Sequence, residues 1–337
     1  MRNNKVTYFF IFMCILTSCL FVVNIFKEKS NKQEHEYMQK EEKNIIEYKA
    51  NQTVRVKFHE TGEIVAMDIN DYLRGVLPAE MSPTYNIEAL KAQAIVARTY
   101  TYKKMNEKVE GDNADICDYH GHCQAFYTKE KIYEIWENKG YTKEEILDFW
   151  DKINQAVVAT QNEVITYEGK LINAYFHASS PIKTEDVSQI WGNVSYPYLK
   201  SVESIEDESY ENRTSKVVIT CSEFADKINN DDSIIGYVDS EEMKNICICE
   251  NTITGRVKNV KINDIVILAE KLRTLIGLKS TNFNITVDNE NIIFDVIGYG
   301  HGVGMSQVGA NTYANSGMKY QDIINHYYSG VNIEMLE

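Results

Sequence analysis

A glutamate in apolar sequence surroundings is the chain's first candidate for acid–base chemistry. Glu80 follows Leu77, Pro78 and Ala79 and precedes Met81. Apolar surroundings disfavour the ionised carboxylate and raise its pKa, and a carboxyl group that keeps its proton near neutral pH can act as a general acid. The alternative is a solvated glutamate at the end of a helix, the commonest setting for this residue type.

Two further segments offer polar groups to a pocket. Residues 298–307 read Gly-Tyr-Gly-His-Gly-Val-Gly-Met-Ser-Gln, and alternate glycines let the backbone approach another group closely. The spacing is neither a dinucleotide fingerprint nor a phosphate loop. A predicted strand ending at His177 leads to a second polar stretch. These segments can hydrogen-bond a sugar, or they can be structural loops. The candidate substrate-binding residues are His177, Ser179, Thr184, His301, Ser306 and Gln307.

A short loop holds four possible metal ligands, Cys117, His120, His122 and Cys123. Cysteine and histidine are ligands of tetrahedral zinc, although this spacing matches no standard zinc finger. A disulfide between Cys117 and Cys123 is the alternative. Two histidines in the same loop favour zinc, and ligation by protein side chains alone would make the site structural.

The composition limits the class of partner. The 337-residue chain has a formal net charge of -14. Binding to nucleic acid needs a basic surface that neutralises phosphates, so the charge argues against a nucleic-acid partner. It is compatible with a neutral polysaccharide, or with glycan from which acidic peptides have been removed.

The N-terminal segment predicts a membrane anchor. Residues 6–26 carry no charge, and about 20 apolar residues cross a bilayer as a helix. Arg2 and Lys5 precede them, which predicts a cytoplasmic segment 1–5 and a single-pass protein of the cell membrane with its bulk extracytoplasmic. A lipoprotein cleavage box ending at Cys19 and a cleaved signal peptide are alternatives. Residues 27–50 predict a polar stalk, and residues 51–337 a folded catalytic domain.

The folded part mixes strand and helix patterns. Alternation predicts hairpins over 53–67 and 164–177, and helices are expected from about residues 70, 87 and 142, the last with a capping box. Pro78 and Pro83 should leave Glu80 in a short bend. Later strands surround a helix near 265–276. Hairpins without repeated βαβ units predict an α+β fold of mixed, largely antiparallel sheets with packed helices, preceded by the single N-terminal transmembrane helix.

Several segments, in order along the chain, resemble the stage II sporulation protein D (SpoIID) family. The resemblance extends from about residue 54 to the C-terminus. It departs at 177–184, where His-Ala-Ser-Ser-Pro-Ile-Lys-Thr replaces the family's His-Ser-x-x-Gly-Gly-x-Thr. The matching segments are Tyr-Leu-Arg-Gly-Val-Leu-Pro-Ala-Glu-Met at 72–81, the alanine-rich 89–100, Trp-Gly at 191–192, Pro-Tyr-Leu-Lys-Ser-Val at 197–202, Gly-His-Gly-Val-Gly-Met-Ser-Gln at 300–307 and His-Tyr-Tyr-Ser-Gly at 326–330.

The resemblance implies a lytic transglycosylase, a lyase that degrades the peptidoglycan cell wall during engulfment of the forespore. Glu80 maps onto the family's catalytic acid/base. It would cleave the β-1,4 bond between N-acetylmuramic acid (MurNAc) and N-acetylglucosamine (GlcNAc) in peptide-stripped glycan strands and leave 1,6-anhydro ends. Because the sugar's own 6-hydroxyl is the nucleophile, a second carboxylate is unnecessary. A structural zinc near residues 117–123 is also implied.

The same resemblance implies partners and a place of action. A sporulation amidase would strip the peptides, and that amidase and a multi-span membrane protein would form the engulfment complex with this chain. The chain would act on the mother-cell side of the septum or of the engulfing membrane.

Two other functions remain open. The same domain occurs in proteins described as amidase enhancers, which makes a non-catalytic glycan-binding module the first alternative. The second is a zinc amidase or peptidase that uses the ligands at 117–123. Two cysteines in such a short loop suit a structural site better than a catalytic one.

Overall fold

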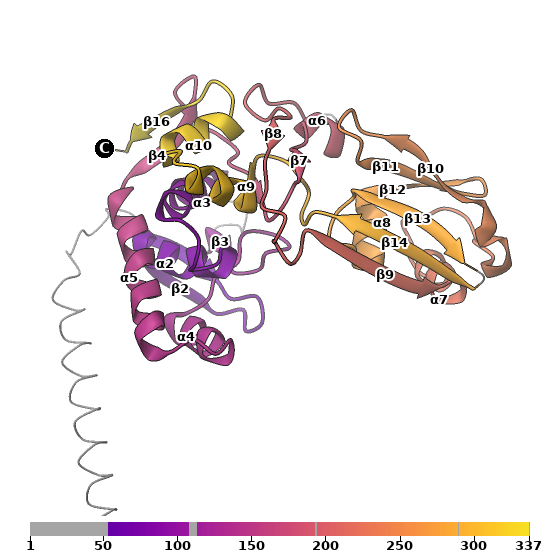
Figure 1. Ribbon diagram of the computed structural model, residues 1–337, viewed down its shortest axis with the longest axis horizontal. Coiled ribbons are helices and arrows are strands. Elements are labelled where there is room, and N and C mark those ends of the chain that lie inside the picture. The colour runs from indigo at the N-terminus through magenta and orange to yellow at the C-terminus, as the bar shows by residue number, and fades with distance from the viewer. Residues whose placement is uncertain (1–52, 108–112, 193, 289, 337) are drawn as a thin grey trace, which may run out of the picture. The chain divides into compact units, whose positions relative to one another are not determined.

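Helices and short strands alternate along residues 53–107, 113–192, 194–288 and 290–336, the part of the chain that the computed structural model describes (Figure 1). The fold is α+β with mixed sheets. Two separate hydrophobic cores organise it. The first takes residues from both ends of the described chain, and the second takes residues from 217 to 296.

The first core begins with a hairpin that leads into a helix. β1 (Thr53–Lys57) pairs antiparallel with β2 (Ile64–Asp68), as predicted, and parallel with β3 (Ile116–Cys117). α2 (Ile69–Glu80) starts where Asp68 accepts a hydrogen bond from the N–H of Asn70. Its apolar side, which includes Tyr72, Leu73 and Leu77, is fully buried.

α3 (Ile87–Glu107) is the central helix of this core and packs against α2, α5, α9 and α10. Small alanines at 89, 92, 94 and 97 are all buried and let these neighbours approach. Arg98 is also buried, and its guanidinium donates to the carbonyls of Thr160, Glu163 and Val157. A buried cation is costly unless it is hydrogen-bonded, so these carbonyls stabilise it.

Two amphipathic helices form a hairpin beside α2. α4 (Lys129–Asn138) begins at Thr128, and α5 (Lys143–Ala159) begins with the predicted capping box of Thr142 and Glu145. Trp136 and Trp150 face each other's helix in a small apolar cluster with Ile132 and Ile146. The spacing of these residues, four apart on each helix, places them on one face.

The remaining strands of the first core are short. β4 (Glu163–Tyr167) pairs with β5 (Lys170–Leu171) and with β16 (Asn332–Met335), and β6 (Phe176–His177) runs parallel to β15 (Met305–Ser306). β7 (Ile182–Lys183) pairs with β8 (Glu203–Ser204), with α6 (Val187–Ile190) between them. α9 (Gln307–Asn315) and α10 (Tyr320–Tyr327) complete this part.

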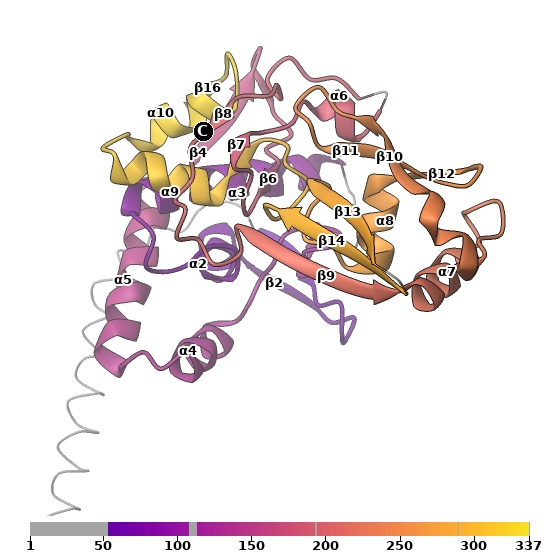
Figure 2. The same ribbon diagram turned by 45° about the vertical axis from the view of Figure 1, so that its right-hand side comes forward.

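The second core lies between two antiparallel sheets and their helices, and both views show these elements grouped together (Figure 2). One sheet has the order β10-β11-β12 and the other β13-β14-β9. The elements are β9 (Thr214–Thr220), α7 (Cys221–Asn229), η1 (Ser240–Asn245), β10 (Ile246–Asn251), β11 (Val257–Ile262), β12 (Ile265–Leu268), α8 (Ala269–Ile276), β13 (Phe283–Asp288) and β14 (Asn291–Ile297).

A buried arginine links the two cores. Arg256, before β11, lies 3.6 Å from the carboxylate of Glu185 and donates to Ser180 Oγ (2.7 Å) and to the carbonyl of Gly300 (3.3 Å). Both charged side chains are almost completely buried. Burial raises the pKa of Glu185 to about 7, against the opposing effect of Arg256. Removing either partner would leave a buried charge uncompensated, so the pair fixes this joint.

Three sequence predictions on the fold need correction. The helix that should have ended at Pro78 continues through Glu80, because the missing N–H and the ring of a proline disturb the preceding turn and leave the two residues after it free to stay helical. The strand predicted through residue 177 is broken after β5, and β6 pairs with β15 instead. The helix expected from 265 begins at Ala269, after the short strand β12.

The predicted transmembrane helix and the predicted single-pass location in the cell membrane are also corrected. Across the described ranges, no helix combines the length and the apolar character that crossing a bilayer requires. α3 has 21 residues but carries charged side chains such as Lys91 and Arg98. The predicted segments 1–5, 6–26 and 27–50 lie outside the described residues.

Candidate active site

Glu80 is the last residue of α2, where the helix meets the loop that leads to α3. The N–H of Met81 still donates to the carbonyl of Leu77 (2.8 Å), so the end of the helix is well formed. Glu80 follows the buried residues Val76 and Leu77 by four and three positions, so it lies on the same face of the helix, and its carboxyl group contacts residues 125 and 307.

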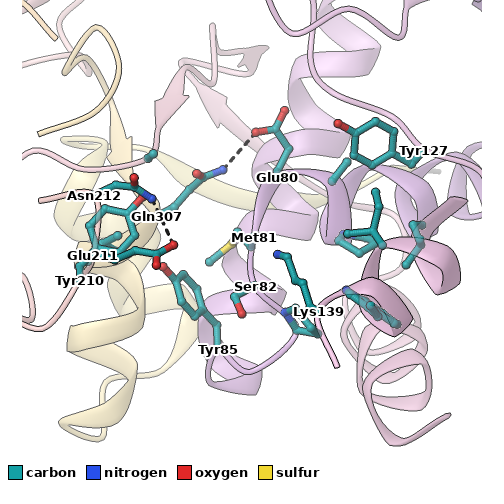
Figure 3. Close-up of a pocket in the computed structure, with 18 residues that line it drawn as sticks. Glu80, Met81, Ser82, Tyr85, Tyr127, Lys139, Tyr210, Glu211, Asn212 and Gln307 are labelled. Carbon is teal, nitrogen blue, oxygen red and sulfur yellow. Dashed lines mark hydrogen bonds between the residues drawn. The ribbon is translucent and has the colours of Figure 1, made fainter. Parts of the chain in front are cut away.

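Two donors hold the Glu80 carboxyl group. The backbone N–H of Ala125 donates to Oε1 (2.7 Å) and the amide of Gln307, the first residue of α9, donates to Oε2 (3.3 Å; Figure 3). Burial raises the pKa of Glu80 to about 7, although both hydrogen bonds act in the opposite direction by favouring the carboxylate. Near neutral pH the group therefore exchanges its proton readily, as a general acid and base requires.

The carboxyl group opens into a cavity of about 370 Å³, here called the glutamate pocket. In Figure 3, Tyr127 and Lys139 lie on one side, and Tyr85, Tyr210, Glu211 and Asn212 on the other. The complete lining is Pro78, Ala79, Glu80, Met81, Ser82, Pro83, Tyr85, Tyr127, Ile132, Ile135, Trp136, Lys139, Ala178, Tyr210, Glu211, Asn212, Gln307 and Val308. Aromatic rings beside a few polar groups are typical of a site for a polar organic ligand.

The charges in this pocket are few. Glu80 and Glu211 are the acids of its lining and Lys139 is its cation. Glu211 is solvent-exposed and accepts from the amide of Asn212 (3.5 Å). The pocket thus offers one carboxyl group tuned toward neutral pH, and a cation within the same cavity.

Of the six predicted substrate-binding residues, only Gln307 lines the glutamate pocket. Ser179 and Ser306 both donate to the buried carboxylate of Glu206, at 2.5 and 2.6 Å. The Thr184 hydroxyl accepts from the N–H of Val202 (3.0 Å). These three residues therefore stabilise the segments in which they lie. Their contact with substrate stays a prediction.

The two predicted histidines lie next to each other, His177 buried and His301 half-buried. Their rings lie 5.6 Å apart, His177 Nδ1 lies 3.1 Å from the carbonyl of Val303, and His301 Nδ1 accepts from the N–H of Val303. Burial lowers the pKa of His177 well below its usual range and that of His301 to about 3. Both rings are therefore neutral at physiological pH and pack beside β6 and β15 rather than beside Glu80.

Three of the four predicted metal ligands come together. The Nδ1 atom of His122 lies 3.5 Å from Cys117 Sγ and 3.6 Å from Cys123 Sγ, and all three ligand atoms lie within 4.8 Å of one another. No disulfide joins the two cysteines, so the alternative pairing is not formed. His120 lies outside this group and packs on Tyr119.

The chemistry and the geometry of these three side chains fit zinc. A tetrahedral zinc bonded to sulfur at about 2.3 Å and to nitrogen at about 2.0 Å places those two atoms about 3.5 Å apart. The observed separations of Cys117 and Cys123 from His122 match this value. The group also lies just before Ala125, whose N–H holds Glu80.

Most residues of the pocket wall were not predicted from the sequence. Tyr127, Trp136 and Lys139 come from α4 and its flanks, a helix that was not predicted. Its signal was present, because Thr128 is a good N-cap and Ile132 and Trp136 are four residues apart. The donor at Ala125 is a backbone group and has no sequence signal at all.

Comparisons with known proteins agree with the sequence motifs. The sequence model of the stage II sporulation protein family matches residues 57–167. Stage II sporulation protein D of Bacillus subtilis (strain 168) is 32% identical over 270 residues, which cover 79% of this chain and 74% of that protein. Stage II sporulation protein D of Bacillus amyloliquefaciens is 31% identical over 267 residues, again 79% and 74%.

A more distant relative has a different name. The amidase enhancer of Bacillus subtilis (strain 168) is 26% identical over 308 residues, 77% of this chain and 40% of that protein. These relatives support a role in sporulation and are consistent with lytic activity on the cell wall. With about a third of its residues identical over most of both chains, this protein belongs to the stage II sporulation protein D family.

Proposed function

We propose that this protein is a peptidoglycan lytic transglycosylase that cleaves the β-1,4 bond between MurNAc and GlcNAc in peptide-free glycan strands. The observation that carries the proposal is Glu80, a carboxyl group with a pKa of about 7 that opens into a cavity of about 370 Å³. Family membership supports a cell-wall substrate.

The reaction uses Glu80 twice. In the first step its protonated carboxyl group donates to the glycosidic oxygen, and the bond to C1 breaks through an oxocarbenium-like state. In the second step the carboxylate takes the proton from the 6-hydroxyl of the same MurNAc as that oxygen attacks C1. A pKa near 7 suits both directions of transfer. The product is a 1,6-anhydro ring, and water is not consumed.

Two neighbours support these roles. The amide of Gln307 and the N–H of Ala125 fix the orientation of the carboxyl group and stabilise it when it is ionised. Lys139 is the cation among the described residues of the lining. Each MurNAc carries a free lactyl carboxylate once the peptides are gone, and Lys139 can attract that group. Tyr127, whose ring is 41% exposed, provides an aromatic surface beside the sugar.

The product test separates this function from its alternatives. The described domain, acting alone on purified peptide-free strands, should release 1,6-anhydro ends, read by mass spectrometry. Reducing ends would instead indicate a hydrolase that uses water. Binding without any product would favour a non-catalytic role such as that of an amidase enhancer. In the cell we propose that a sporulation amidase supplies the stripped strands, in a complex with a multi-span membrane protein.

The pH dependence should follow the ionisation of Glu80. Because the free enzyme must carry the proton, kcat/KM should be level below about pH 7 and fall about tenfold per pH unit above it. The Gln307→Leu variant removes a donor that favours the carboxylate, so its profile should shift to higher pH. A profile that rises through pH 7 would contradict the assignment of Glu80 as the acid in the free enzyme.

We also propose that Cys117, His122 and Cys123 hold a structural zinc ion. A bound zinc would tie β3 to the loop that precedes Ala125 and so steady the donor to Glu80. We expect zinc at about 1,000 times its Kd to raise the Tm by about 10 °C. Ligand binding at that excess adds about 4 kcal/mol to the free energy of unfolding.

The Cys117→Ser variant should lose this rise in Tm, whereas Cys249→Ser, on an exposed strand of the second core, should keep it. Scanning calorimetry with and without zinc measures both variants. An unchanged Tm for the wild-type protein at saturating zinc would rule the metal out.

A further inference from the structure

A second cavity, of about 400 Å³, shares no residue with the glutamate pocket and is here called the tryptophan pocket. It lies where the end of α6 meets the sheet β10-β11-β12, which are neighbours in both ribbon views (Figures 1 and 2). Its lining is Gln189, Ile190, Trp191, Gly192, Thr252, Val257, Lys258, Leu268, Glu270 and Thr281.

Trp191 forms a rigid wall of this cavity. Its ring packs edge-on against Tyr175 (4.9 Å between centroids) and tilted against His301 (5.2 Å). Even so, 38% of its surface is exposed, whereas Trp136 and Trp150, the chain's other tryptophans, are only 2% and 6% exposed. No hydrogen bond of its indole N–H to a described residue is present. A large ring held in place with one side open is a ready contact surface.

Polar groups without protein partners line the same cavity. Glu270 Oε1 and Thr281 Oγ1 are both buried and make no hydrogen bond within the described chain, and Thr281 is only 1% exposed. Buried polar atoms of this kind are uncommon in native structures and point to a missing polar partner. The side chain of Gln189 is half-buried, and its amide also makes no hydrogen bond to a described residue.

The chemistry of this lining selects one class of ligand. The unpartnered groups are one oxygen of the Glu270 carboxylate, a hydroxyl and an amide, and such groups recognise hydroxyl and acetamido groups. Phosphate is disfavoured, because Glu270 is an acid and Lys258 is already paired with Glu250 at 2.7 Å. Val257 and Leu268 add apolar surface that the methyl group of an acetamido substituent can contact. A pyranose has both an apolar face for the indole ring and hydroxyls at its edge.

We propose that the tryptophan pocket is a second saccharide-binding site, which takes an N-acetylhexosamine unit on Trp191 without cleaving it. Glu270 is the carboxylate among the described residues of this lining. Unlike Glu80, it is paired with a cation, Arg273 (3.1 Å), so the pocket has no counterpart of the proposed acid. That the bound unit belongs to a peptidoglycan strand rests on the proposed function. Such a site holds a long strand to the protein at a point separate from the bond that breaks.

The three tryptophans make a direct test possible. In a Glu80→Gln background, which prevents turnover, hexa-N-acetylchitohexaose should change the intrinsic fluorescence. Trp191→Phe keeps an aromatic ring but should remove most of this change, while calorimetry still detects binding. Trp191→Ala should weaken binding by about tenfold, the effect of losing a central aromatic contact. Trp136→Phe, in the glutamate pocket, should keep the fluorescence response of Trp191.

A second measurement covers the case in which Trp191→Ala disturbs the fold. Gln189→Ala and Leu268→Ala, on surface positions of the same lining, should each weaken binding of the hexasaccharide without changing the Tm. The proposal is overturned if the hexasaccharide binds equally well to Trp191→Ala and to both of these variants.

The proposed function fails separately from this inference. If the wild-type protein releases anhydro ends but Trp191→Ala binds and cleaves long strands like wild type, the second site is wrong and the enzyme assignment stands. If wild type makes no product yet Trp191 still reports saccharide binding, the enzyme assignment is wrong and the second site stands.

Discussion

Glu80→Gln lowers the turnover of peptide-free glycan strands by about 10³-fold or more, the largest effect that we expect from a single exchange at the site. A general acid alone contributes about 10²- to 10⁴-fold, and Glu80 acts as both acid and base in the proposed reaction. Glutamine keeps the size of the side chain and can still contact Gln307, so the fold should be retained. Anhydro ends counted by mass spectrometry, with the Tm as a check on folding, measure the effect.

Glu211→Gln is the matched control, because Glu211 is the other acid of the glutamate pocket. In a reaction whose nucleophile belongs to the substrate, this exchange should cost less than about tenfold. Equal losses for both variants would contradict the single-carboxyl mechanism and indicate a glycosidase that uses two carboxylates.

Gly304→Ala should have the largest effect on stability that we expect from a single exchange. Gly304 has φ +73°, and an added Cβ atom would clash with the carbonyl oxygen of Tyr175. A left-handed backbone costs an ordinary residue about 1–2 kcal/mol, and overpacking adds about 1–3 kcal/mol. We expect a loss of about 3 kcal/mol or more in the free energy of unfolding, measured by urea denaturation.

Gly169→Ala separates the two causes of this loss. Gly169 has nearly the same backbone angle, φ +71°, but no atom lies within 4 Å of an added Cβ. Its cost should therefore be the backbone cost alone, about 1 kcal/mol. If both variants lose the same amount, the close approach of Gly304 to Tyr175 contributes nothing.

Local signals in the sequence were enough for many single elements. The hairpin of β1 and β2 and the capping box at Thr142 follow from alternation and N-cap chemistry within a few residues, and both are observed. The parallel pairing of β6 with β15 joins residues that are over a hundred positions apart, and no local pattern encodes such a contact. The bend predicted at Pro78 did not form, because a proline disturbs the turn before it and does not by itself end the helix after it.

The candidate site could likewise be predicted only in part from the sequence. Glu80 and Gln307 were identified from residue type and motif, and the structure brings them within 3.3 Å. The histidines and serines of the same motifs contact Val303 and Glu206 in the structure, and their contact with substrate stays a prediction. A glycine-rich motif shows that the backbone approaches something closely. It does not show which side chains turn toward the cavity.

The contact between Glu80 and Gln307 has a consequence for how the protein is made. Glu80 and Gln307 are 227 residues apart, and the whole second core is synthesised between them. Contacts of such long range make folding slow and leave the first core open until late in synthesis. A growing or shortened chain that stops before α9 lacks the amide that orients the acid. Under the proposed function, such incomplete chains would not be competent to degrade the wall.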